Sequence, residues 1–449
     1  MGMKWTEEQS KVITLRDRNI LVSAAAGSGK TAVLVQRILS KIMDPDRPVD
    51  IDRLLIMTFT RAAAGEMKER ISNAIDQALY ENPDNEHLQR QAALIHNAQI
   101  TTIDGFCSYI IRNYFHMVEL DPGYRTAEEG ELKLLQEDVM KDLLEEAYEK
   151  ADPKFLSLVE CYASGKSDDE IRDMVYKLYQ AAMSHPYPEE WLEECMEVYR
   201  VQTIEELRET SWIQLLWETL DEKLDQAEAL TESARKICNE PDGPYFYDEA
   251  LVDDLNFWRE VRRCRETKDY DKVADILSGH TFAKLSAKRD SSIDPVKKEQ
   301  AKELRDEEKE ICKDLSTKFF NQKEEILLEL IACAREPLEG LVELTLQFKE
   351  AFSSKKREKN LLDFTDMEHF ALRILVEKVD GELIPTQAAR ELSEKYEEVM
   401  VDEYQDSNFV QELITTMVSG WVVIPQKKHR SRGSTCTKTS EAGQRYLLR

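Results

Sequence analysis

Residues 19–31 read Asn-Ile-Leu-Val-Ser-Ala-Ala-Ala-Gly-Ser-Gly-Lys-Thr. The apolar residues of 19–23 predict a buried strand, and apolar residues at helical spacing predict a helix over 30–42. The small residues between them let backbone N–H groups wrap phosphate oxygens at a helix N-terminus, with Ala24 in place of the pattern's first glycine. Lys30 can reach the β- and γ-phosphates, and the Thr31 hydroxyl can ligate Mg²⁺. The stretch therefore predicts a nucleotide-binding loop rather than an ordinary glycine-rich turn, formed by Ala24, Ala25, Ala26, Gly27, Ser28, Gly29, Lys30 and Thr31.

The segments that follow continue the alternation of strand and helix. Residues 54–57 predict a second strand, 62–79 a helix and 99–103 a third strand. Strands that alternate with helices imply an α/β fold with a parallel, doubly wound sheet. Ligands of such a sheet bind at the carboxyl ends of its strands.

A second chemical signal lies near the other end of the chain. Residues 398–403 read Glu-Val-Met-Val-Asp-Glu, an apolar strand that ends in two carboxylates. Asp402 can hold Mg²⁺, and Glu403 can polarise the water that attacks a phosphate. Apolar runs followed by acidic residues are common at strand ends, so this motif is weak by itself. It indicates a nucleotide site only in combination with the predicted phosphate-binding loop at residues 24–31.

The pattern changes between these two motifs. Charged amphipathic helical segments, such as 131–150 and 297–334, replace the strands. The basic run 355–359 is interpreted as a solvated linker, with a phosphate contact as the alternative. The predicted domains are a sheet domain over 1–125, a mostly helical inserted domain over 126–358, the resumed sheet domain over 359–420, and an aberrant, disordered tail over 421–449.

Composition limits the classes of protein that fit. The 449 residues carry a formal charge of −27, which disfavours a simple DNA-coating protein but permits a narrow DNA track. The eight cysteines form no CxxC pair, which disfavours metal clusters and disulfides. No apolar run is long enough to span a membrane, and no signal-peptide core begins the chain. These features predict a cytoplasmic protein without membrane contact.

Five stretches together resemble one family. Residues 402–408 read Asp-Glu-Tyr-Gln-Asp-Ser-Asn and resemble motif II of UvrD/Rep-type superfamily 1 DNA helicases. Residues 5–9 resemble their Q motif, 58–70 their motif Ia, 101–107 their TxHSFC stretch with Asp104 in place of His, and 363–372 the stretch before motif II. The start of the chain, residues 32–37 and residues 120–129 resemble the AddA/RexA-type members of this family, which belong to bacterial ATP-dependent helicase/nucleases.

This resemblance implies a RecA-like motor domain 1A interrupted by an inserted domain 1B, with ATP and Mg²⁺ as cofactors. It implies that Gln9 reads the adenine edge, that Thr31 and Asp402 hold the metal ion, and that Lys30, Glu403 and Gln405 are catalytic. The residues expected on single- or double-stranded DNA are Thr58, Phe59, Thr60, Arg61, Thr102 and Phe106. For Phe59 and Phe106, a place in the hydrophobic core is the alternative.

The function expected from the resemblance is that of an ATP-dependent 3′–5′ DNA helicase subunit of a helicase/nuclease, acting in double-strand-break repair by recombination. Its expected partner is a second helicase/nuclease subunit (AddB/RexB type). A stand-alone UvrD/PcrA-like repair helicase and a non-motor nucleotide-binding module are the alternatives. The motifs of a second motor domain and of a nuclease domain do not follow residue 406, and the charge of the tail differs from that of the preceding chain. A truncated chain that binds ATP and DNA without full activity is therefore expected.

Overall fold

A computed structural model describes residues 4–25, 27–118, 120–121, 123–163, 165, 167–288 and 290–419. The predictions for Ala26 and for the tail 421–449 therefore lie outside the described residues. None of the helices in the described part of the chain combines the length and apolarity that crossing a membrane requires.

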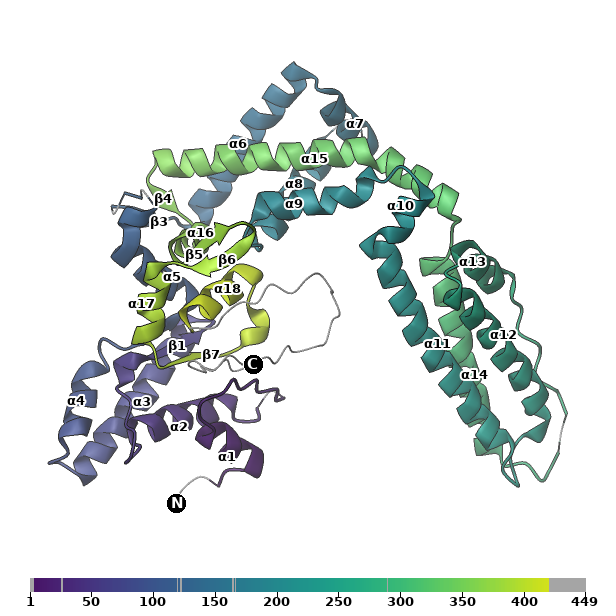
Figure 1. Ribbon diagram of the computed structural model, residues 1–449, viewed down its shortest axis with the longest axis horizontal. Coiled ribbons are helices and arrows are strands. Elements are labelled where there is room, and N and C mark those ends of the chain that lie inside the picture. Colours follow the sequence, from purple (N-terminus) through teal and green to yellow (C-terminus); the bar gives the residue numbers. More distant parts are fainter. Residues whose placement is uncertain are drawn as a thin grey trace. The chain divides into compact units, whose positions relative to one another are not determined.

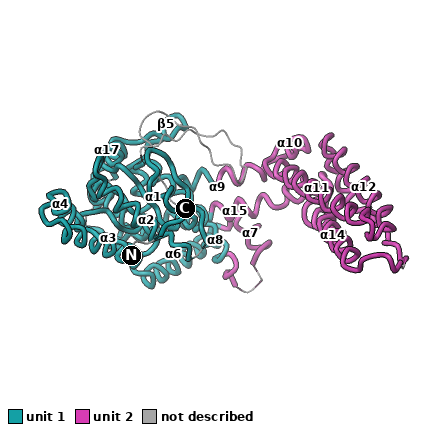
Figure 2. The backbone as a smooth tube through the Cα atoms, turned by 90° about the horizontal axis from the view of Figure 1, so that it is seen from below, with its two compact units in different colours: residues 1–150, 172–191, 344–449 teal, residues 151–171, 192–343 magenta. Residues whose placement is uncertain are grey.

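The chain divides into two compact units, coloured separately in Figure 2. Unit 1 comprises Met1–Lys150, Arg172–Trp191 and Leu344–Arg449, and unit 2 comprises Ala151–Ile171 and Leu192–Glu343. These bounds differ from those of the predicted domains, because parts of the predicted insertion 126–358 pack within unit 1.

Unit 1 contains every strand that the structure describes (Figure 1). Its elements are α1 (Glu7–Thr14), α2 (Lys30–Ile42), β1 (Leu54–Thr58), α3 (Arg61–Glu81), α4 (Glu86–Leu94), β2 (Gln99–Thr102), α5 (Ile103–Tyr114), β3 (Arg125–Thr126), α6 (Glu129–Lys150), β4 (Leu361–Leu362), α16 (Phe364–Leu375), β5 (Val376–Val379), β6 (Glu382–Pro385), α17 (Gln387–Lys395), β7 (Glu398–Val401) and α18 (Phe409–Val418). Three helices cross the unit boundaries: α8 (Asp169–Met183), α9 (Pro188–Glu197) and α15 (Glu324–Glu358).

The central sheet of unit 1 is parallel and has the strand order β2-β1-β7. Successive side chains of a strand point to opposite faces, so each face is covered separately. Leu55 and Met57 of β1 pack in one core with α5, α16, α17 and α18. Leu54 and Ile56 pack in a second core with α2 and α3. The sheet therefore lies between two helical layers, and its carboxyl edge is where β1, β2 and β7 end.

All the secondary-structure elements described in unit 2 are helices. It contains α7 (Pro153–Tyr162), α10 (Ile204–Glu209), α11 (Ser211–Cys238), α12 (Asp248–Glu266), α13 (Tyr270–Gly279) and α14 (Pro295–Asp314). Buried Trp217, Trp258 and Tyr270 contribute the largest rings to its main core. This agrees with the helical character expected of the middle of the chain.

Three sequence-based predictions about secondary structure were wrong. Residues 19–23 belong to no strand among the described residues: Ile20 is buried but Leu21 is exposed, so a run of three apolar residues did not bring the segment into the sheet. The helix expected over 297–334 is interrupted: α14 continues as a π-helix over Leu315–Phe319, residues 320–323 are not helical, and α15 begins at Glu324. The basic run is no linker, since Lys356 is buried in α15 and bonds to Asp363 at 2.7 Å.

Candidate nucleotide site

The loop before α2 has the backbone that small residues permit. Gly27 and Gly29 have φ angles of 77° and 83°, in the left-handed region that favours glycine. The φ of Gly29 lets the chain enter α2 directly at Lys30. The first N–H groups of a helix have no partner within the helix and carry partial positive charge. The N-terminus of α2 can therefore receive an anion at the position that the sequence predicted.

The second half of the site follows β7. The backbone N–H of Asp402 donates to the carbonyl of Met57 at 2.9 Å, which continues the pairing with β1 beyond Val401. Asp402 and Glu403 therefore lie at the carboxyl edge of the sheet, where a doubly wound sheet binds ligands.

The side chains of the two halves meet across this edge. Lys30 Nζ lies 3.5 Å from Glu403 Oε2, with 26% and 41% of the two side chains exposed. Gln405 Nε2 donates a hydrogen bond to the same carboxylate. The structure thus brings together Lys30, Glu403 and Gln405, which the sequence assigned to catalysis from opposite ends of the chain.

The two adjacent carboxylates have different proton affinities. Burial raises the pKa of Asp402, and the neighbouring charge of Glu403 raises it further. The hydrogen bond from Gln405 lowers the pKa of Glu403, and the charge of Lys30 adds to this effect. Glu403 is therefore held ionised, whereas Asp402 gains most from a nearby cation. Carboxylates in such contrasting environments suit different chemical roles.

Glu403 also has an unusual backbone. Its φ of 53° and ψ of 42° place it in the left-handed region, which costs a non-glycine residue about 1 kcal/mol or more. Its N–H donates to Asp402 Oδ1 at 3.1 Å. The turn directs the chain away from β7 immediately after the two carboxylates.

Two cavities border Lys30. The first, of about 200 Å³, is lined by α1, the loop and α2, including Gln9, Val12 and Asp402. The second, of about 600 Å³, is lined by residues that include Thr31, Arg70 and Glu403. Lys30 lines both cavities, so a ligand with an extended chain of phosphates could occupy both.

Gln9 is held at the edge of the first cavity. Its side-chain Nε2 donates to the carbonyl of Ser28 at 3.2 Å, and its Oε1 accepts from the N–H of Thr6 at 3.0 Å. The second bond belongs to a capping box at the start of α1. The Q-motif glutamine therefore lies beside the loop, where the resemblance placed it.

Arg70 is a further cation at this site that the sequence patterns did not single out. It lies on α3, lines the second cavity and pairs with Glu66 one turn earlier. Arg70 is the last residue of the stretch that resembles motif Ia, so the available signal was its place in that motif. It adds a second cation beside Lys30 for binding anions.

The donors assigned to a metal ion are the Thr31 hydroxyl and the Asp402 carboxylate. Both are hard oxygen donors, which Mg²⁺ prefers, and it commonly retains several waters and phosphate oxygens as further ligands. The described residues contain no group of three or more His, Cys, Asp or Glu side chains that could hold a metal ion alone. The donor set fits an ion brought in with a phosphate ligand.

The residues expected on DNA separate into exposed and buried groups. The Phe59 side chain is 59% exposed just beyond β1, next to exposed Thr60 and Arg61. Thr58 is buried, and its hydroxyl donates to the carbonyl of Thr60 at 3.0 Å. Thr102 is also buried and caps α5 by accepting from the N–H of Gly105. The hydroxyls of Thr58 and Thr102 therefore serve the local backbone in this structure.

Phe106 does not fit its predicted place on the DNA track. Its side chain is 0% exposed and packs in the core formed with α16 and β7. The physical reason is that α5 begins immediately after β2 and turns Phe106 inward. Its ring is not available for stacking on a base. Asp104, on the first turn of the same helix, has a pKa raised by burial and partly lowered again by Arg61.

Comparisons with known proteins give a consistent result. The sequence profile of the UvrD/REP helicase N-terminal domain matches residues 5–421. The AddA-type subunit of the ATP-dependent helicase/nuclease of Lachnoclostridium phytofermentans is 48% identical over 92% of this chain and 30% of its own length. The corresponding subunits from Clostridium perfringens and Bacillus pumilus are 43% and 38% identical, over 93% and 96% of this chain and 33% and 34% of theirs. The chain thus spans about a third of the length of these relatives.

Proposed function

The chain belongs to the UvrD/REP helicase family, whose N-terminal domain has a RecA-like fold, and from this membership we propose that it binds ATP and Mg²⁺ as part of a DNA helicase motor. The observation that carries the proposal is the meeting of Lys30 and Glu403 between two cavities at the carboxyl edge of a parallel sheet. The mostly helical segment 126–358, which includes unit 2, is the inserted domain of this motor.

The residues divide the work of binding and hydrolysis. Gln9 contacts the adenine edge beside the first cavity, and the loop N–H groups with Lys30 bind the β- and γ-phosphates. Thr31 and Asp402 would hold Mg²⁺, which would neutralise charge that develops on the transferred phosphate. Glu403, kept ionised by Gln405 and Lys30, accepts a proton from the attacking water.

The fuller function concerns the longer proteins that this chain resembles. We propose that the chain serves in a 3′–5′ DNA helicase subunit of a helicase/nuclease, which works with a second subunit of AddB/RexB type in recombinational repair of double-strand breaks. The names of the similar proteins and identities of 38–48% support this proposal. Single-stranded DNA passes Phe59, Thr60 and Arg61, since an exposed aromatic ring and a neighbouring cation suit sequence-independent binding.

The nucleotide site is tested by Lys30→Ala. Hydrogen bonds to charged groups contribute about 1.5–3 kcal/mol each, so the variant should bind Mg²⁺–ATP roughly 10- to 100-fold more weakly. Because the Lys30–Glu403 pair is partly exposed, the melting temperature should change little. Equilibrium titration with a fluorescent ATP analogue measures the affinity, and circular dichroism the stability.

Lys133→Ala is the matched control for this titration. Lys133 forms an exposed ion pair with Glu129 on α6 and lines neither cavity, so its loss should leave the affinity unchanged. Equal affinity of the Lys30→Ala variant and the unaltered chain would contradict the proposed site. An ATPase rate that rises with added single-stranded DNA would favour a motor over a non-motor nucleotide-binding module.

A further inference from the structure

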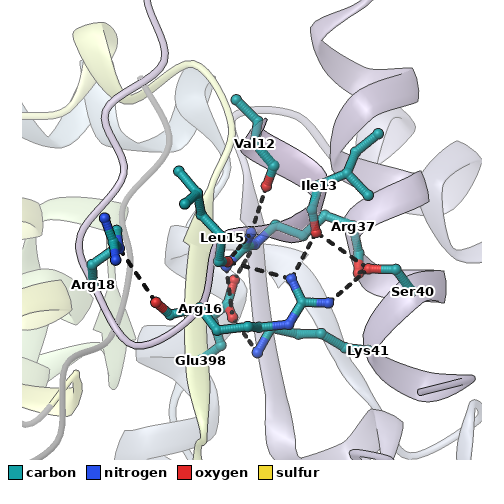
Figure 3. Close-up of polar contacts among 9 residues, drawn as sticks. All are labelled: Val12, Ile13, Leu15, Arg16, Arg18, Arg37, Ser40, Lys41 and Glu398. Carbon is teal, nitrogen blue, oxygen red and sulfur yellow. Dashed lines mark hydrogen bonds and ion pairs between the residues drawn. The ribbon is translucent and has the colours of Figure 1, made fainter. Parts of the chain in front are cut away.

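Arg37 is a completely buried arginine on the helix that begins with Lys30. Its guanidinium bonds to Glu398 through Nε at 2.6 Å and through Nη2 at 3.3 Å. Its Nη1 donates to the carbonyls of Val12 at 2.5 Å and of Leu15 at 2.8 Å (Figure 3). One side chain of α2 is therefore bonded to the first residue of β7 and to the end of α1.

The charges around Arg37 are arranged to make this burial tolerable. Glu398 is also completely buried, and Lys41 Nζ lies 2.7 Å from its Oε2. Two cations thus share one carboxylate, and the carbonyl oxygens at the end of α1 supply the remaining negative partial charge. A buried charge is costly without such partners. The planar fork of arginine suits this geometry because it can bond to the carboxylate and to carbonyls at once.

A second arginine reinforces the contact between α1 and α2. Arg16 Nη1 donates to the carbonyl of Ile13 at 2.7 Å, and its Nη2 donates to Ser40 Oγ at 3.0 Å. Ser40 is on α2, so Arg16 connects the end of α1 with α2 close to Arg37 (Figure 3). The carbonyls at the end of α1, which lack partners within the helix, are thus bonded by arginines.

Each element that Arg37 joins carries a part of the nucleotide site. Helix α1 contributes Gln9 and Val12 to the wall of the first cavity. Lys30 lies seven residues before Arg37 on α2, about 10 Å along the helix axis. Asp402 lies four residues after Glu398, about 13 Å along the strand. Arg37 is therefore remote from the phosphates, yet it is bonded to all three elements that surround them.

We propose that Arg37 is a positioning residue that fixes α1 against α2 and β7, so that Gln9 is held where it can contact the base of the nucleotide. This inference rests on the proposed nucleotide site and adds the source of its selectivity for the base. Arg37 itself touches no ligand. Its loss should affect recognition of the base, which depends on α1, more than binding of the phosphates, which depends on the loop and Lys30.

The test compares three ligands: Mg²⁺–ATP, Mg²⁺–GTP and inorganic tripolyphosphate. In Arg37→Lys the charge remains, but a single ammonium group cannot bond to Glu398 and to both carbonyls of α1. We expect the preference for ATP over GTP to fall about tenfold, the factor for one lost hydrogen bond of ordinary strength. Affinity for tripolyphosphate should stay within about twofold of the original, well below that factor.

Two further variants separate positioning from general destabilisation. Gln9→Ala should lose the preference for ATP to the same extent, and the double variant Gln9→Ala/Arg37→Lys should lose no more than either alone. Arg305→Lys is the matched control, because Arg305 is equally buried and bonds to Asp254 through the same fork in unit 2. It should lower the melting temperature without changing the preference.

The outcomes are distinct. An unchanged preference in Arg37→Lys, together with a lowered melting temperature, would overturn the inference and leave the nucleotide site standing. Equal affinity of the Lys30→Ala variant and the unaltered chain for Mg²⁺–ATP would instead overturn the proposed function. If Arg37→Lys does not fold, Arg16→Ala replaces it, because Arg16 is only partly buried. It should reduce the preference about twofold to threefold, a fraction of one hydrogen bond, and no reduction would again overturn the inference.

Discussion

Helix α2 forms ion pairs with strand β7 and with the turn that follows it, and two of these pairs differ in their access to water. Arg37 and Glu398 lie 2.6 Å apart with both side chains 0% exposed, whereas Lys30 and Glu403 lie 3.5 Å apart and partly exposed. In the buried pair, Arg37 bonds to Glu398 and to two carbonyls at the end of α1, and no side-chain surface of either residue is open to a ligand. In the exposed pair, Lys30 and Glu403 can give up their contact with each other and bind a ligand instead. The buried pair that stabilises the fold and the exposed pair at the proposed nucleotide site therefore lie in different parts of α2.

The largest effect that would test this contrast is the loss of Glu398. Glu398→Ala leaves two buried cations, Arg37 and Lys41, without their carboxylate. Removing one partner of a buried pair costs about 3–5 kcal/mol. We expect this loss in the free energy of unfolding, measured by urea denaturation. Lys30→Ala is the comparison, with a loss of about 1 kcal/mol or less. If Glu398→Ala and Lys30→Ala lost equal free energies of unfolding, the two ion pairs would not differ in their contribution to stability.

Unit 2 contains a second buried carboxylate, Glu308, which can be compared with Glu398. Glu308 is fully buried and accepts a hydrogen bond from Trp258 Nε1 at 2.6 Å. Burial raises its pKa from 4.5 to about 7, the nearby charge of Asp254 adds to this effect, and Trp258, Thr231 and Arg305 oppose it. The folded state therefore retains a proton that the unfolded state has released between pH 4.5 and 7.

The free energy of unfolding should consequently fall as the pH rises through this window, and the penalty should be complete above pH 7. Its size is up to about 3 kcal/mol. Glu308→Gln removes the titration, so its stability relative to the original chain should increase from pH 5 to pH 8. Thermal unfolding at both pH values measures the change. A constant difference between the two proteins would show that Glu308 does not titrate in this range.

The smallest change in stability is expected at Phe59, the exposed one of the two phenylalanines that follow strands. Phe59→Ala should weaken binding of single-stranded DNA by about 1–3 kcal/mol if a base stacks there, with little change in stability. Phe106→Ala should instead lower the free energy of unfolding by about 3–5 kcal/mol, because it leaves a cavity in the core. Fluorescence anisotropy at low salt measures the DNA affinity. An unaltered affinity in Phe59→Ala would return Phe59 to a purely structural role.

The sequence predicted the parts of the site that depend on local pattern. Lys30 follows small residues before an amphipathic helix, and Asp402 follows an apolar strand, so both could be placed at the carboxyl edge of a sheet. The family resemblance is confirmed by the profile match and by the similar proteins. The burial of Phe106 could also have been predicted from the sequence. The apolar residues of α5 recur at helical spacing, which indicates a buried face. They are Ile103, Phe106, Cys107, Ile110 and Ile111.

Other features depend on contacts that no local pattern reveals. Arg37 and Glu398 are 361 residues apart in sequence, and nothing in either neighbourhood marks them as partners. The predicted strand over 19–23 failed because pairing requires a neighbouring strand as well as apolar residues. The break between α14 and α15 likewise follows from tertiary contacts, since Glu324 at the start of α15 is buried and bonds to Arg208. Burial of charged groups is decided by such distant partners.

The left-handed backbone of Glu403 has a consequence for protein engineering. Glycine would adopt this conformation without steric cost, so the residue that best suits the backbone is not the one that carries the carboxylate. A library screened for heat resistance alone would therefore be drawn towards glycine or asparagine at this position. Selection for thermostability must be coupled to a selection for ATP hydrolysis, or it will enrich stable proteins that have lost the proposed general base.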